Sequence, residues 1–172
     1  MSYDKDDSTV LSSSRKLEIM IQNQSFILLN EKYVGLLFDD SSHDKHPLRY
    51  YHVKNGKGIT PQPNKSYFVF LYSGSGRFTL KSGIEGFLPA GSYFSTSGSF
   101  KLTGEGKAVV IEIDHSRGIY PANNYWASDL IGGPIEASGR LRYIDGCTDS
   151  LLIPPIKQGD PCLNHLHFPE KI

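Results

Sequence analysis

Apolar and polar residues alternate along most of this chain with a period of two, the spacing of β-strands. Gly and Pro residues interrupt the alternation at intervals of roughly ten residues, and helical periodicity is almost absent. Closely spaced strands with a turn between each pair are typical of an antiparallel sandwich or barrel. The predicted strands lie at residues 16–22, 25–31, 33–38, 48–54, 66–72, 77–82, 100–104 and 107–115, with two short ones around Pro89, Ala90 and Gly91.

The pattern changes at residue 118. The following residues are irregular and aromatic, and we expect one short helix near Trp126. Strand-like segments then return in the sequences LRYIDG, SLLIPP and CLNHLHFP. The chain is therefore predicted to divide into a disordered tail at 1–15, a barrel with preceding strands at 16–117, and a C-terminal extension at 118–172.

Composition narrows the classes of function. The 172 residues suffice for one domain with a buried core, and 18 Lys and Arg balance 18 Asp and Glu. A neutral chain gives no electrostatic reason to expect a nucleic-acid partner, and no run of about 18 apolar residues predicts a transmembrane helix. The polar N-terminal residues lack the apolar stretch of a signal peptide. We expect a cytoplasmic protein with no membrane partner, in which Cys147 and Cys162 stay reduced.

The sequence GIEGFLPAGSYFSTSG, at residues 83–98, carries the most specific motif. Gly83, Pro89 and Gly91 have the spacing of a hairpin with a Gly at one end and a Pro-x-Gly corner at the other. In this spacing the segment resembles the second conserved motif of the cupins, and YFVFLYSGSGRFTL before it resembles the end of the first. The resemblance implies an all-β fold, a cupin-type double-stranded β-helix (jelly roll) with additional N- and C-terminal strands.

The same resemblance implies that the family's metal site is missing. It places the metal-binding His of the family at Phe94 and a ligand Glu at Tyr67, and residues 60–66 contain no His. Phe and Tyr cannot bind a divalent metal in the family's way, so we expect no metal and no cofactor in the barrel. By strand parity Val69 and Leu71 join Tyr67 and Phe94 on the inner face. These four side chains would line an apolar pocket for a small organic ligand or fill the core.

The C-terminal sequence CLNHLHFPEKI contains a second candidate site. His165 and His167 would lie on one face of a strand, as a metal-binding pair requires, and Cys162 is near in sequence. Two alternatives stand beside metal binding. The histidines are ordinary surface residues, or residues 146–172 resemble the connection and first strand of a second cupin barrel, as in bicupins.

The alternation in residues 162–168 also predicts a strand paired with another strand. It sets Leu163, His165 and His167 on one face and Leu166 and Phe168 on the other. The second face is the more apolar, so we expect Leu166 and Phe168 to be buried.

Two hypotheses of function follow. The first is a non-catalytic cupin-like domain that binds a small organic ligand or acts as structural partner to a catalytic barrel. The alternative is the N-terminal half of a metal-dependent bicupin oxygenase or isomerase, with Fe or Zn in a barrel that follows. No catalytic residue is identified. Exposed strands at 16–38 and 162–168 need cover, so we expect a homodimer through edge strands.

Overall fold

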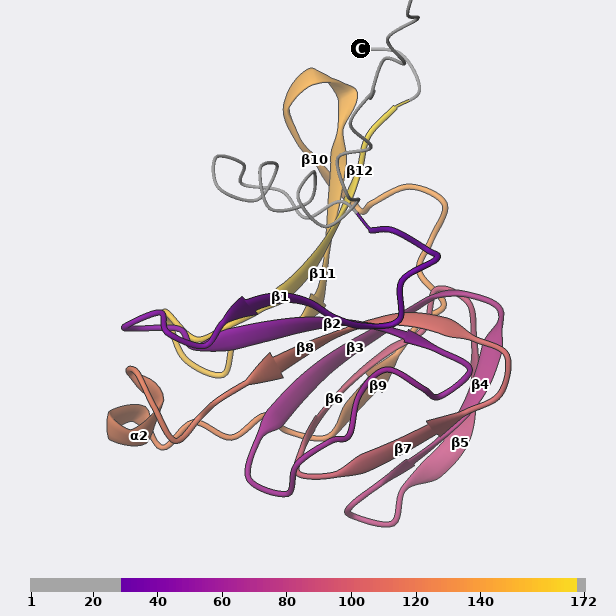
Figure 1. The fold of residues 1–172 in the computed structure, drawn as a ribbon. Coiled ribbons are helices and arrows are strands. Elements are labelled where there is room, and N and C mark those ends of the chain that lie inside the picture. Colours follow the sequence, from indigo (N-terminus) through magenta and orange to yellow (C-terminus); the bar gives the residue numbers. More distant parts are fainter. Residues whose placement is uncertain (1–28, 170–172) are drawn as a thin grey trace, which may run out of the picture. The chain divides into compact units, whose positions relative to one another are not determined.

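Strands make up most of the regular structure of residues 29–169, the part of the chain that the computed structural model describes (Figure 1). The predicted tail and the predicted strand at 16–22 lie outside these residues, as does most of the one at 25–31. No helix in the described part is long and apolar enough to cross a membrane. The strands are β1 Gly35–Asp40, β2 Leu48–Lys54, β3 Ser66–Ser73, β4 Ser75–Leu80, β5 Glu85–Pro89, β6 Tyr93–Ser97, β7 Phe100–Thr103, β8 Lys107–Ile113, β9 Leu130–Gly132, β10 Leu141–Arg142, β11 Thr148–Ile153 and β12 Leu163–His167.

The barrel strands pair as one long hairpin folded over itself. β4 pairs with β5, β3 with β6 and β2 with β8, all antiparallel. Residues 55–65, between β2 and β3, form no regular strand, but the N–H of Asn55 donates to the carbonyl of Gly106, just beyond β7. Nested antiparallel pairs of this kind are the Greek keys of a jelly roll. The predicted all-β jelly roll is therefore confirmed.

Two sheets enclose the barrel core. One has the strand order β1-β2-β8-β3-β6-β9 and the other the order β5-β4-β7. β9 was not predicted, because its three residues are too few to show an alternating pattern. A one-turn helix, α2 (Tyr120–Asn123), lies shortly before Trp126, close to the predicted position. All of these elements belong to the unit Glu31–Ile172.

The Pro-x-Gly corner lies where the cupin-like motif predicts it, between β5 and β6. Gly91 has a φ of +85°, in the left-handed region that favours glycine. Its N–H donates to the carbonyl of Leu71 at 2.6 Å, and a Cβ there would approach the backbone nitrogen of Ile135 to 3.2 Å. Any larger residue at this corner would both strain the backbone and press on the segment that follows β9.

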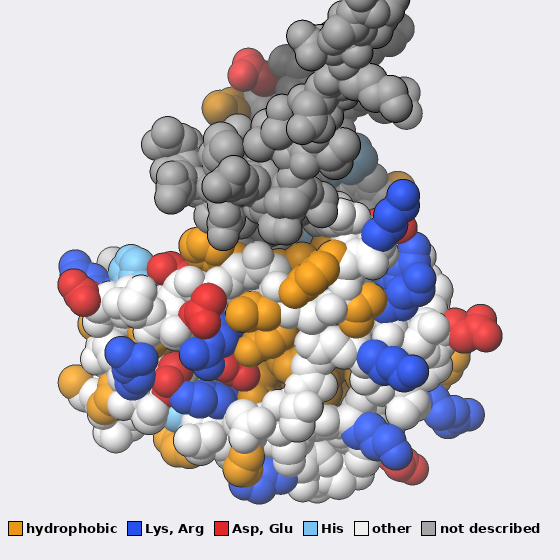
Figure 2. Space-filling view, in the orientation of Figure 1, with side chains coloured by type: hydrophobic (Ala, Val, Ile, Leu, Met, Phe, Trp, Pro, Cys, Tyr) orange, Lys and Arg blue, Asp and Glu red, His pale blue; other side chains and the backbone are white. Residues whose placement is uncertain are grey.

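The surface of the barrel carries charges of both signs. Figure 2 shows Lys and Arg side chains among Asp and Glu side chains on the visible face, with apolar side chains between them. Arg49 and Asp39 form an ion pair of 3.0 Å, and Lys65 and Asp114 form one of 2.5 Å. Opposite charges therefore offset each other locally on this surface.

A third sheet, β10-β11-β12, packs beside the barrel (Figure 1). Leu152, Ile153 and Leu163 join Phe68 of the six-stranded sheet in a second apolar cluster, outside the barrel. The predicted strand at the C-terminus is paired, because β12 lies antiparallel to β11.

The face that β12 buries is the opposite of the predicted one. The ring of His165 packs at 6.1 Å from the ring of Phe70, while Leu166 and Phe168 are exposed. The reason is that Leu163, on the histidine face, is drawn into the cluster outside the barrel, and register then fixes the rest of the strand.

Candidate functional site

The barrel interior contains the four side chains that the sequence indicated as a pocket. Tyr67, Val69 and Leu71 of β3 and Phe94 of β6 are each at most 1% exposed. Val69 stands opposite Phe94 in the antiparallel pair of strands. All four belong to one apolar cluster between the two sheets.

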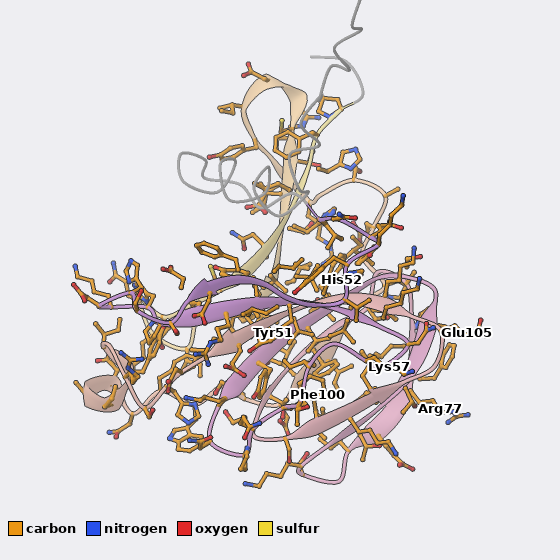
Figure 3. The ribbon with its side chains drawn as sticks, in the orientation of Figure 1. Tyr51, His52, Lys57, Arg77, Phe100 and Glu105 are labelled. Atoms are coloured by element: carbon orange, nitrogen blue, oxygen red, sulfur yellow. The ribbon has the colours of Figure 1, made fainter. Side chains whose placement is uncertain are left out.

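Aromatic rings pack closely in this interior. Phe94 stacks on Phe78 with ring centroids 5.6 Å apart and meets Phe100 edge-on at 5.3 Å. Phe100 in turn meets the ring of Tyr67 edge-on at 5.2 Å. Figure 3 shows Phe100 and Tyr51 within the barrel, on strands of different sheets. Stacked and edge-to-face contacts at these distances are favourable, so the rings bind the two sheets together.

One carboxylate, Glu112 of β8, lies at an inward position, and its side chain is only 6% exposed. Its Oε2 accepts a hydrogen bond of 3.1 Å from the hydroxyl of Tyr67, and its Oε1 lies 3.4 Å from Nη1 of Arg49. The Tyr67 hydroxyl also accepts the N–H of Gln62 at 2.6 Å. Burial raises the pKa of Tyr67 well above its usual value, so the hydroxyl stays protonated and remains a donor to Glu112.

Glu112 was not predicted from the sequence, although the sequence contains a signal for it. The residue interrupts the apolar run VVIEI of β8 and shares its parity with Ala108 and Val110, which are both buried. A charged residue at an inward position of a strand needs a partner. Arg49 stands opposite it on β2 and Tyr67 opposite it on β3.

The interior does not fit a divalent metal. The positions that the cupin resemblance assigns to ligands hold the packed rings of Tyr67 and Phe94, and both oxygens of Glu112 already have partners. A protein metal site requires several N, O or S ligands around one point. Within residues 29–169 no three His, Cys, Asp or Glu side chains are grouped in that way.

The second candidate set, His165, His167 and Cys162, is not brought together as a metal group within the described residues either. The two histidines share the half-buried face of β12, whereas Cys162 is an exposed free thiol just before the strand. Glu170, the nearest carboxylate in the sequence, lies outside the described residues.

A groove of about 400 Å³ lies on the surface between β6, the segment after β9, and β11. Its volume is within the range of small-molecule sites. The lining is mainly apolar, and an ion pair of 2.7 Å between Glu136 and Arg140 stands at its rim. β10 pairs with β11 only at Thr148 and Asp149. From Ser150 onward, the same edge of β11 has no strand partner among the described residues. The groove is lined by Tyr93, Gly133, Pro134, Ile135, Glu136, Arg140, Leu141, Ser150, Leu151 and Leu152.

Another buried polar cluster surrounds His115, two residues beyond β8. Its Nδ1 is hydrogen-bonded to Oγ of Ser66 at 2.9 Å, and its ring lies 4.0 Å from the exposed ring of Trp126. Ser66 also accepts the N–H of Ala127 at 3.1 Å. The cluster thereby fastens the segment after α2 to the end of the barrel.

Burial lowers the pKa of His115, a shift to which nearby Lys65 adds and which Asp114 opposes. The unfolded chain therefore takes up a proton before the folded protein does, and we expect the free energy of unfolding to fall as the pH decreases below about 6.5. Denaturation followed between pH 7 and pH 5 measures this slope. His115→Gln should flatten it. An unchanged slope in His115→Gln would contradict the assignment.

No family model matches the sequence, and no curated protein matches it. Among solved structures, the chain is similar to the Clostridium difficile EutQ protein, with 11% identity over 48% of this chain and 61% of that one and a TM-score of 0.33. It is similar to an RmlC-like cupin protein from Desulfovibrio desulfuricans, with 11% identity over 52% of this chain and 91% of that one and a TM-score of 0.35. For a mutant of Bacillus subtilis oxalate decarboxylase OxdC, the identity is 13% over 49% of this chain and 24% of that one, with a TM-score of 0.32.

The chain thus spans less than two thirds of the EutQ protein and 24% of the decarboxylase. Its own strand pairing, with β2 on β8, β3 on β6 and β4 on β5, is that of a jelly roll. The chain has a jelly-roll fold.

Proposed function

We propose that this chain is a non-catalytic cupin-type domain that holds no metal in its barrel and binds a small organic ligand at its surface. One observation carries the proposal. Tyr67 and Phe94, at the inward positions where the family would have ligands, both pack their rings against Phe100. The carboxylate of Glu112 is bound by Tyr67 and Arg49. The inner face then works as a structural core.

The groove beside β11 is the better candidate for the ligand. Tyr93, Ile135 and Leu152 give it an apolar surface, and Ser150 and the charged rim supply polar groups. Binding sites for small molecules combine these features, with a mainly apolar lining and a few polar groups that fix the orientation. The uncovered edge of β11 favours a ligand that carries an amide, because such a group can pair with backbone N–H and C=O groups.

Nuclear magnetic resonance of ¹⁵N-labelled protein tests both parts of the proposal. A mixture of small aromatic amides should shift the amide resonances of Tyr93, Ser150 and Leu152. Paramagnetic Mn²⁺ should leave the resonances of Phe94 and Glu112 unbroadened, and elemental analysis of the purified protein should give less than stoichiometric Fe, Mn and Zn.

Ile135→Trp should abolish the shifts by filling the groove, and Phe87→Trp, at an exposed position on β5, is the matched control. Stoichiometric metal in the purified protein, or Mn²⁺ broadening centred on Glu112, would show that the barrel is a metal site. Ligand shifts confined to the barrel interior would show that the groove is not the binding site.

The N-terminal half of a metal-dependent bicupin is a second candidate. It is favoured by the sheet β10-β11-β12, which takes no part in the nested pairing of the barrel. On this alternative, Fe or Zn would be held by a barrel after residue 172. Sequencing the reading frame beyond residue 172 tests this alternative. A continuation with paired histidines and a downstream Glu would support the enzyme, and a reading frame without them would contradict it.

A further inference from the structure

Residues 125–129, which precede β9, pack on the end of the barrel without forming a strand. We call them the end segment. The N–H of Ala127 donates to Oγ of Ser66 on β3 at 3.1 Å, and its carbonyl accepts a hydrogen bond of 2.8 Å from Oγ of Ser97 on β6. Ala127 is 5% exposed and Ser66 is fully buried. Both backbone groups of Ala127 therefore depend on these two hydroxyls.

The two hydroxyls also contact each other and His115. Oγ of Ser66 lies 2.7 Å from Oγ of Ser97 and 2.9 Å from Nδ1 of His115. Each hydroxyl has one proton to donate. The carbonyl of Ala127 only accepts, so the proton of Ser97 goes to it. The proton of Ser66 then goes to Ser97, because two hydroxyl oxygens at 2.7 Å are joined by a proton.

This count of protons determines the state of His115. Oγ of Ser66 has given its proton to Ser97, so it accepts from the imidazole, and Nδ1 carries a proton. The hydrogen bonds run in one direction, from Nδ1 through Ser66 and Ser97 to the carbonyl of Ala127. In the neutral ring Nε2 is then the unprotonated nitrogen. It has no hydrogen-bond partner within the residues that the structure describes.

A second proton, on Nε2, would place a positive charge in a poorly solvated site. His115 is 6% exposed, and the ring of Trp126 lies 4.0 Å from its own ring. Two charged groups face the imidazole, the ammonium of Lys65 and the carboxylate of Asp114. These two pair with each other at 2.5 Å, so they offer the imidazolium no unpaired negative charge. A protonated ring is therefore better solvated outside this site.

We propose that the end segment is a pH-sensitive latch, closed while His115 is neutral and opened when the ring takes up a second proton. Opening moves the imidazolium into water and breaks the hydrogen bonds of Ala127, while the barrel strands stay paired. Together with Phe68 and Ile153, the end segment lines a pocket of about 130 Å³. Acid therefore widens this pocket, which shares no residue with the groove beside β11.

Amide hydrogen exchange of the full chain, followed by nuclear magnetic resonance, tests the opening. Between about pH 6.5 and pH 5 the protection of the Ala127 amide, corrected for the intrinsic exchange rate, should fall by up to about tenfold per pH unit, since one proton is taken up. Dilute urea should leave this protection unchanged, because a local opening exposes little surface. The amide of Val69, in the middle of β3, should lose protection in urea. His115→Gln, which does not titrate in this range, should remove the pH dependence at Ala127.

The tautomer of His115 gives an independent measurement. The ¹⁵N resonances of the ring should show a protonated Nδ1 at pH 7. Ser97→Ala frees the proton of Ser66 for the imidazole, so it should move the ring proton to Nε2. Ser95→Ala is the matched control on the same strand, because Ser95 donates to the carbonyl of Ser128 at 2.6 Å and does not touch His115. In that variant Nδ1 should stay protonated.

Three results would overturn the proposal. One is a parent ring whose Nδ1 is unprotonated at pH 7, and another is a ring in Ser97→Ala with the tautomer of the parent. The third is an Ala127 amide whose protection does not depend on pH, or is lost only together with that of Val69 in urea. None of the substituted residues lines the groove beside β11, so a failure here is separate from a failure of ligand binding.

Discussion

Replacement of Phe94 by alanine is expected to lower the free energy of unfolding by about 3–5 kcal/mol, the usual cost of truncating a fully buried Phe. Its ring stacks on Phe78 and meets Phe100 edge-on, so the substitution removes contacts that join the two sheets. The backbone of β6 is paired on both sides and cannot collapse readily into the space. Chemical denaturation of the parent and the variant measures the difference.

The matched control is Phe87→Ala on neighbouring β5, where the side chain is mostly exposed. That variant should differ from the parent by roughly 0.5 kcal/mol or less. Equal denaturation midpoints for Phe94→Ala and the parent would show that the inward position of Phe94 contributes nothing to stability. The packed core on which the proposed function depends would then be wrong.

The strands and the inward side chains of the barrel were predictable because both follow from local alternation. β2 lies at the predicted residues 48–54, and the parity of β3 put Tyr67, Val69 and Leu71 on the inner face. Corner residues such as Gly91 were predictable for a similar reason, since a positive φ limits the residues that fit.

The features that the sequence did not predict depend on contacts between distant segments. Alternation in β12 gave its two faces, but only the packing of Leu163 on the outside of the barrel decides which face is buried. Leu166 and Phe168, the more apolar pair, are left exposed as a result. The groove beside β11 is likewise formed by segments that meet only in the folded chain, and no local pattern indicates it.

The hypothesis that residues 146–172 begin a second barrel rested on a resemblance in one strand. β12 pairs with β11, and Leu152 and Ile153 of that hairpin pack on the outside of the barrel. The strands of a jelly-roll barrel and the strands of this small sheet have the same alternation of apolar and polar residues. The sequence pattern alone therefore could not distinguish the start of a second barrel from a separate small sheet.

Replacement of Arg49 by alanine should lower the free energy of unfolding by about 2 kcal/mol, because it leaves the buried carboxylate of Glu112 with one partner instead of two. Loss of a partner from a fully buried ion pair costs about 3–5 kcal/mol. We expect less here since Tyr67 still donates to Glu112 and the Arg49 side chain is itself partly exposed.

Arg49 also pairs with Asp39 at 3.0 Å, and Asp39→Ala separates that contact from the one with Glu112. Asp39 is exposed, so its removal should cost about 0.5 kcal/mol. Glu112→Leu replaces the buried carboxylate with an apolar side chain of similar size, and in this background Arg49→Ala should cost roughly as little as Asp39→Ala. Denaturant unfolding of the parent, the single variants and the double variant completes the cycle.

Equal costs for Arg49→Ala with and without Glu112 would mean that the carboxylate does not depend on the guanidinium. The inner face would then have a carboxylate that could accept another partner, and its role as a purely structural core would have to be abandoned.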